Sequence, residues 1–209
     1  MYLPDHFAET RLPEIHRLVH EHPLGMLVAA TPGGGLDANH VPFELEPAQG
    51  PHGTLQAHVA RANPLATELA GGADVLVVFR GVQGYVSPNW YPTKHETHRH
   101  VPTWNYEAVH AHGRLRLVDD ERFLRGLLAR LTRRHEAAEP VPWRMGQAPA
   151  DYLERMLGMV VGIEVEVTRW EAKRKLSQNR EARDFDGAVQ ALRERGRADL
   201  ADAMARTRD

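Results

Sequence analysis

Cysteine is absent from this chain of 209 residues. Its absence excludes disulfide bonds, thiolate metal sites and cysteine nucleophiles. No apolar run approaches the roughly 20 residues that a membrane helix needs. The start of the chain, MYLPDH, also lacks the basic flank and apolar stretch of a secretory signal. We therefore expect a cytoplasmic protein that makes no contact with a membrane.

A strong net charge is also lacking. The chain has 26 Lys and Arg residues against 28 Asp and Glu residues, a formal charge of −2 with neutral histidines. This balance gives no general attraction to nucleic acid, so DNA binding would need a local basic patch. The G-x-G-x-x-G, P-loop, H-E-x-x-H and G-x-S-x-G motifs are missing too, which disfavours dinucleotide folds, nucleotide hydrolases and common hydrolase scaffolds.

What the sequence does contain is a series of strand patterns. The clearest is 73–79 (ADVLVVF), which is β-branched and apolar enough to be buried on both faces. Residues 105–118 and 159–170 alternate between apolar and polar side chains, as half-buried strands do. The other predicted strands are 25–30, 36–45, 54–59 and a brief one at 84–87.

Helices are predicted between these strands. Thr10 and Pro13 open one, Asn63 and Pro64 open a short one, and Asp120 opens a third with an apolar stripe. A short helix is expected at 150–157, a polar loop at 94–100, and two polar helices at 186–195 and 199–206, separated by Gly196.

This element order favours a mainly β, α+β fold. We expect an antiparallel barrel with peripheral helices, because most of the strands are joined by hairpins and the helices fall at the corners. No linker interrupts the chain, so residues 1–209 are predicted to form a single domain with a helical C-terminal extension from about residue 184.

Arg61 and Asn63 form the first candidate site, in the segment HVARANP. A helix start offers free backbone amides, and a nearby arginine adds a bidentate phosphate clamp. The pair would therefore suit a mononucleotide phosphate. Alternatively, Asn63 caps the helix and Arg61 is a solvated surface charge.

Aromatic side chains concentrate in a second candidate region, with Trp90, Tyr91, Trp104 and Tyr106 close to Asn105. They could flank a planar ring system or pack a subunit interface. They could equally close the barrel end as ordinary core. The nearby histidines at 95, 98 and 100 lack the spacing of a recognised zinc motif, so we predict no metal site there.

Basic residues gather in the third candidate region, KRKLSQNR at 173–180. Such a patch can bind phosphate, a DNA backbone or an acidic partner. Ser177, Gln178 and Asn179 add hydrogen-bonding groups that suit an anion or a ring edge. A solvated basic loop is the alternative.

Taken in order, five segments resemble the PaiB family of FMN-binding negative transcriptional regulators. The resemblance spans Met1 to about Met204, and the segments are MYLPDHF, HVARANP, GYVSPNWYP, VPTWNYEAVHAHG and KLSQNR. It implies a split barrel, like that of the pyridoxamine phosphate oxidase and flavin reductase group. It also implies a homodimer with FMN in the clefts between subunits.

The resemblance assigns roles to individual residues. Arg61 and Asn63 would lie near the flavin phosphate. The isoalloxazine would be approached from the neighbouring subunit by Trp104, Asn105 and Tyr106. The same cleft would be lined by Lys175, Ser177, Gln178 and Arg180.

Three functions remain open on this basis, and the last of them is a barrel that has lost its flavin and serves as an interaction module. The first is a transcriptional regulator that binds FMN, and DNA contact is expected from the family alone, because no convincing helix-turn-helix is visible in the sequence. The second is a flavin-dependent oxidoreductase that uses the same cleft. In either case the flavin would carry any redox chemistry, so no catalytic residue is predicted.

Overall fold

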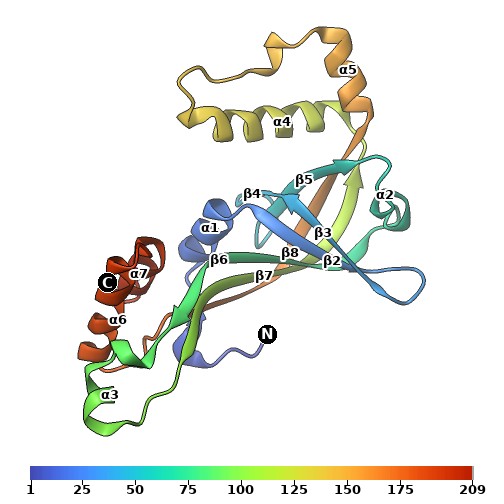
Figure 1. The fold of residues 1–209 in the computed structure, drawn as a ribbon. Coiled ribbons are helices and arrows are strands. Elements are labelled where there is room, and N and C mark those ends of the chain that lie inside the picture. Colours follow the sequence, from blue (N-terminus) through green and yellow to red (C-terminus); the bar gives the residue numbers. More distant parts are fainter. Residues whose placement is uncertain (209) are drawn as a thin grey trace. The chain divides into compact units, whose positions relative to one another are not determined.

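The computed structural model describes residues 1–208, which form two compact units (Figure 1). Unit 1 contains Met1–Glu21, Arg80–His110 and the chain from Glu171 onward. Unit 2 contains His22–Phe79 and Ala111–Trp170. Three long strands contribute residues to both units. The single domain stays a prediction.

The strands form one eight-stranded sheet in the order β3-β2-β6-β7-β8-β5-β4, with β1 paired to β8. The order ends at β3 and β4, so the sheet is not closed into a continuous barrel. Helices hold about as many residues as strands, which confirms the α+β prediction. The strands are β1 (Ala8–Glu9), β2 (Leu24–Ala30), β3 (Leu36–Pro42), β4 (Glu44–Glu46), β5 (Thr54–Ala60), β6 (Ala73–Val86), β7 (Thr103–Val118) and β8 (Val160–Lys175).

Most expected helices are present, and one was missed. Residues 94–100, predicted as a polar loop, belong largely to a helix that begins with Pro92, a residue well suited to a first helical turn. The helices are α1 (Leu12–Glu21), α2 (Leu65–Glu68), α3 (Pro92–Thr97), α4 (Glu121–His135), α5 (Ala150–Gly158), α6 (Ala182–Glu194) and α7 (Ala198–Ala205). Among the described residues, no helix is long and apolar enough to cross a membrane.

Helices α6 and α7 are not the polar helices that the sequence indicated. Each buries one apolar face, and these faces build the core of unit 1 together with strand and turn residues. The buried members of this core include Val86, Tyr91, Leu176, Phe185, Ala188, Leu192, Leu200 and Met204.

Two strands are longer than predicted. β6 continues without a break from 73 to 86, so the expected strands at 73–79 and 84–87 are one. β8 extends five residues beyond the predicted end at Trp170, through Lys175. The predicted strand 36–45 is instead divided at the fully buried Phe43 into β3 and β4.

Close backbone packing in unit 2 requires a glycine at position 113 of β7. A Cβ atom built there would collide with the Glu166 carbonyl oxygen and would lie 2.7 Å from Val165 Cγ1. We expect Gly113→Ala to lower the free energy of unfolding by about 3 kcal/mol, because backbone must move to admit the methyl group. Urea unfolding measures this loss. Gly146→Ala is the control, since nothing lies within 4 Å of its Cβ, and equal stabilities of the two variants would contradict the packing argument.

Candidate functional site

Three consecutive basic residues at the end of β8 point to opposite faces of the strand. Because side chains alternate along a strand, Lys173 and Lys175 share one face, and Arg174 points to the other. The basic patch is therefore not a loop that follows a strand, as the sequence indicated. The two faces have different surroundings and different roles.

Lys175 is half-buried beside the first residues of β7. Its Nζ donates to Thr103 Oγ1 at 2.5 Å and to the Trp104 carbonyl oxygen at 2.6 Å. Burial lowers the pKa of Lys175, and the positive charges of Lys173 and Arg180 lower it further. An anion bound at this point would therefore relieve an existing repulsion.

Lys173 lies between two aromatic rings. Its Nζ is 5.5 Å from the ring centroids of both Tyr2 and Tyr106, and it donates to the Tyr2 carbonyl oxygen at 3.0 Å. Cation–π contacts of this kind hold a charge without neutralising it. The buried Lys173 ammonium thus lies on the same face of β8 as Lys175.

The turn after β8 positions Arg180. Its guanidinium lies 5.1 Å from the Tyr91 ring centroid, and Nη1 lies 3.3 Å from His100 Nδ1. We call Lys173, Lys175 and Arg180 the cationic cluster. Within the described residues, none of the three has a carboxylate partner within ion-pair distance. Cations without carboxylate partners are suited to hold a phosphate or another anion.

Buried hydrogen bonds fix the shape of this turn. Asn105 Nδ2 donates to Ser177 Oγ at 2.9 Å, and both side chains are buried. Ser177 has φ of 67°, a left-handed conformation that is costly for a residue with a side chain. Its carbonyl oxygen accepts from Arg180 N at 3.0 Å, which closes the turn. Asn105 and Ser177 thus stabilise the backbone that presents Arg180.

Gln178 also serves the turn. Its Oε1 accepts from Leu176 N at 2.8 Å, and its Nε2 donates to the Arg174 carbonyl oxygen at 2.5 Å. Both ends of the side-chain amide are therefore bonded to backbone. Of the predicted cleft residues, the structure brings together Trp104, Asn105, Lys175, Ser177 and Arg180 through direct contacts or the shared turn.

A chain of hydrogen bonds connects Arg180 through His100 and Thr93 to Asp184. Thr93 Oγ1 donates to the buried Asp184 Oδ2 at 2.6 Å, so it must accept from His100 Nε2, 2.7 Å away. This arrangement leaves His100 Nδ1 as the acceptor for Arg180. Burial alone would raise the pKa of Asp184, but the Thr93 hydrogen bonds and the nearby positive charges lower it. The sequence analysis did not identify Thr93 or Asp184.

Arg174, on the opposite face, belongs to a buried ion network. Its Nε lies 3.0 Å from Glu107 Oε1, and its Nη1 lies 3.3 Å from Glu9 Oε2. Arg174 and Glu107 are each at least 97% buried. A buried charge needs such partners, so this network joins β1, β7 and β8 and supports the strands that carry the cationic cluster.

Acid should weaken this network through Glu9. Burial alone would raise the pKa of Glu9, but hydrogen bonds from Arg11 and Arg174 lower it from 4.5 to about 2. The folded state thus holds this carboxylate ionised. Its contribution, at most about 3 kcal/mol, is complete above about pH 4.5 and is lost as the pH falls toward about 2.

Urea unfolding at several pH values tests this prediction, with Glu9→Gln as the comparison. The stability difference between the wild-type protein and the variant should shrink as the pH falls through this window. A difference that stays constant from about pH 6 to about pH 2.5 would rule out Glu9 as a contributor to acid sensitivity.

Arg61 and Asn63 lie in unit 2, where both make structural contacts. Arg61 Nη1 and Nη2 donate to Asp119 at 2.8 and 2.6 Å, and the guanidinium also donates to the carbonyl oxygens of Gly158 and Val160. Asn63 Oδ1 accepts from Leu65 N at 3.0 Å at the start of α2. A phosphate would have to replace Asp119 to bind Arg61, so this assignment stays a proposal.

The aromatic residues of the second candidate region divide between core and surface. Tyr91 is completely buried in the core of unit 1, whereas Trp104 is 50% exposed. Trp104 Nε1 donates to Gln83 Oε1 at 3.1 Å, which holds the indole against β6. An exposed, positioned indole next to the cationic cluster is suited to contact a planar ring.

Comparison with known proteins assigns this chain to a family. Residues 1–169 match the sequence family described as "Putative FMN-binding domain". The Bacillus subtilis "Protease synthase and sporulation protein PAI 2" is 31% identical over 193 residues, covering 92% of this chain and 89% of the relative. The chain belongs to this family of FMN-binding domains. The resemblance inferred from the five segments is thereby confirmed.

Solved structures confirm the split-barrel fold. The FAD and heme binding protein from Mycobacterium smegmatis has a TM-score of 0.62 at 18% identity, covering 87% of this chain and 79% of that protein. The flavocytochrome Anf3 from Azotobacter vinelandii has a TM-score of 0.62 at 14% identity, with coverage of 86% and 75%.

The residues of unit 1 fit FMN, the cofactor of this family. The molecule carries a phosphate at one end and a planar three-ring system at the other. The cationic cluster is complementary to the first, and the exposed Trp104 indole is complementary to the second. No described acid or base is required of the protein, because the flavin would supply the redox chemistry.

Proposed function

We propose that this protein binds FMN with the flavin phosphate against Lys175 and Arg180, and that the complex regulates transcription. The observation that carries the binding mode is the cationic cluster, in which burial lowers the pKa of Lys175 and the neighbouring charges of Lys173 and Arg180 lower it further. Bound phosphate would neutralise that repulsion. Of the other predicted residues in unit 1, Trp104 and Tyr106 would contribute contacts around the flavin.

The regulatory role is supported by a relative. The B. subtilis protein, 31% identical over most of the chain, is named for protease synthesis and sporulation. The net charge of −2 supplies no general attraction to DNA, so an operator contact would depend on a local surface. The alternative role, a flavin-dependent oxidoreductase, would use the same binding site. The experiment below distinguishes it from the regulator.

A homodimer is part of the proposal. Tyr85 and Trp104 are 48% and 50% exposed in unit 1, and Val101 is 68% exposed. Exposed aromatic residues of this kind are enriched at subunit interfaces. A second copy that covers them would also remove water from a flavin bound beside Trp104.

The visible spectrum of freshly purified protein, followed by addition of NADPH in air, tests the role. Bound yellow flavin without steady turnover is the expected result. Sustained NADPH oxidation would favour the oxidoreductase over the regulator. A colourless protein that does not bind added FMN would overturn the proposal.

A further inference from the structure

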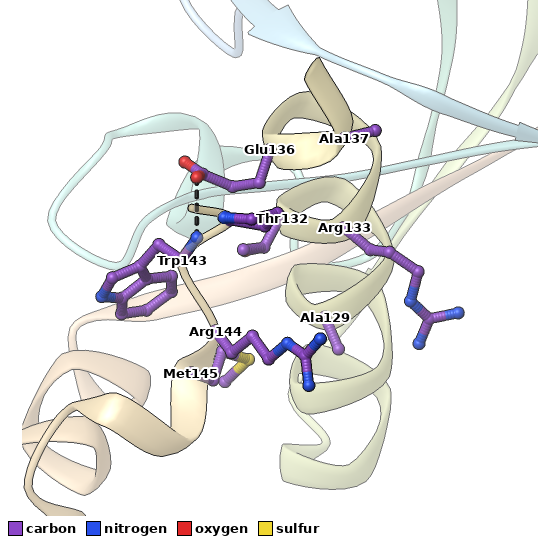
Figure 2. A pocket seen from close by; sticks show the side chains of 9 residues that line it. Ala129, Thr132, Arg133, Glu136, Ala137, Trp143, Arg144 and Met145 are labelled. Atoms are coloured by element: carbon purple, nitrogen blue, oxygen red, sulfur yellow. Dashed lines mark hydrogen bonds between the residues drawn. The ribbon is translucent and has the colours of Figure 1, made fainter. Parts of the chain in front are cut away.

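A separate pocket lies in unit 2, beside the C-terminal end of α4 (Figure 2). Its volume is about 460 Å³, within the range of about 300 to 1,000 Å³ that is usual for small-molecule sites. One wall is the last turns of α4 and the residues that follow it. The other wall is the returning segment at 142–145. The lining residues are Ala129, Thr132, Arg133, Glu136, Ala137, Pro142, Trp143, Arg144 and Met145.

The two walls are held together by a hydrogen bond. The backbone N of Trp143 donates to Glu136 Oε2 at 2.8 Å, the contact drawn as a dashed line in Figure 2. One oxygen of the Glu136 carboxylate therefore accepts a hydrogen bond from the protein backbone. The remaining surface is mostly carbon, from alanine methyl groups, the Pro142 ring, the Trp143 indole and the Met145 side chain. Trp143 is 41% exposed, so a flat apolar group can reach its indole.

Arginine is the charged component of this pocket. Within the part of the chain that the structure describes, neither Arg133 nor Arg144 has a carboxylate partner. Arg133 lies in the last turn of α4, where the helix dipole already favours a cation. Arg144 lies on the returning segment and extends toward α4 in Figure 2. Arg144 is exposed, so its guanidinium is accessible to a ligand.

We propose that this pocket binds a small aromatic carboxylate. The ring would lie against Trp143 and Pro142, and the carboxylate would pair with Arg144. An apolar wall beside the guanidinium groups of Arg133 and Arg144, which have no carboxylate partner among the described residues, selects such a ligand over a neutral aromatic molecule, which would leave both arginines without an anion. The site is distinct from the flavin site, because none of its lining residues belongs to unit 1.

Calorimetric titration with 2-naphthoate and with its neutral analogue 2-naphthamide tests this proposal. We expect 2-naphthoate to bind with a Kd of about 1 mM, the affinity usual for a ligand of this size, and 2-naphthamide to bind about 10-fold more weakly. Arg144→Gln should weaken naphthoate about 10-fold and leave naphthamide unchanged. Ala129→Trp, which fills the pocket, should abolish binding of both.

Arg122→Gln is the matched control, because Arg122 lies on α4 outside the pocket and should not affect either ligand. Lys175→Met separates this site from the flavin site. Naphthoate binding that is lost in Lys175→Met but retained in Arg144→Gln would overturn the proposal. A protein that dissociates from dimer to monomer on Trp143→Glu substitution would also overturn it, since the pocket would then be an interface between copies.

Discussion

Replacement of Lys175 by methionine is expected to weaken FMN binding by about 30-fold, equivalent to about 2 kcal/mol. The variant removes the charge on which the charges of both Lys173 and Arg180 act, and it keeps the length and much of the apolar stem of the side chain. The Lys175 ammonium donates to Thr103 Oγ1 and the Trp104 carbonyl oxygen, so it is already positioned before an anion arrives. Flavin fluorescence quenching measures the change.

Riboflavin makes this experiment specific, because it has the same ring system and no phosphate. The Lys175→Met variant should bind riboflavin as the wild-type protein does. Lys94→Met is the control variant, since Lys94 lies on α3 outside the cluster and should bind FMN normally. Equal losses for FMN and riboflavin would show that Lys175 supports the fold or the ring site and not the phosphate.

The second large effect is on stability. Arg174→Met is expected to lower the free energy of unfolding by about 3 kcal/mol, because it removes the closer of the two cations beside the buried carboxylate of Glu107 and leaves only Arg17 Nη2, 3.8 Å away. Glu9 would keep its bonds to Arg11, so the loss falls mainly on Glu107. Urea unfolding measures the difference.

A double variant distinguishes a lost ion network from lost packing. Arg174→Met combined with Glu107→Leu should recover much of the stability, since both buried charges are then replaced by apolar groups. Arg11→Met should cost much less stability than Arg174→Met, because the Arg11 side chain is 60% exposed. A double variant no more stable than Arg174→Met would show that the charges themselves are not the cause.

Much of the sheet was predictable because burial imposes a period of two on its strands. The apolar alternation from Val109 to Leu115 marks one buried face of β7, as expected. The apolar–polar alternation did not predict the end of β8, where charged residues continue the strand. Lys173, Arg174 and Lys175 were predicted to follow a strand that ends at Trp170, although they continue β8 and their alternation separates Arg174 from the two lysines.

Tertiary contacts account for the other failures. Helix α3 has a polar sequence, and its position depends on the buried Thr93–Asp184 contact, whose partners are 91 residues apart. Glu164 alternates as an outward residue of β8, yet it is buried and bonded to Gln56 and Arg116. A partner distant in sequence leaves no local signal, so neither contact could be inferred from spacing.

The sequence predicted which residues lie near the candidate site, and the role of each residue stays a prediction. Lys175 and Arg180 were identified as cleft residues, and the structure places both in the cationic cluster. Ser177, Gln178 and Asn105 make hydrogen bonds within the protein, and their expected contact with a ligand stays a prediction. A hydrogen-bonding residue in a motif can support the backbone of a site as readily as it can touch the ligand.

A crystal structure of the protein with FMN tests the central claim most directly. The account predicts that the flavin phosphate lies within about 4 Å of Lys175 Nζ and close to the Arg180 guanidinium. A phosphate bound at Arg61, with Asp119 displaced and the cationic cluster still without an anion, would contradict it.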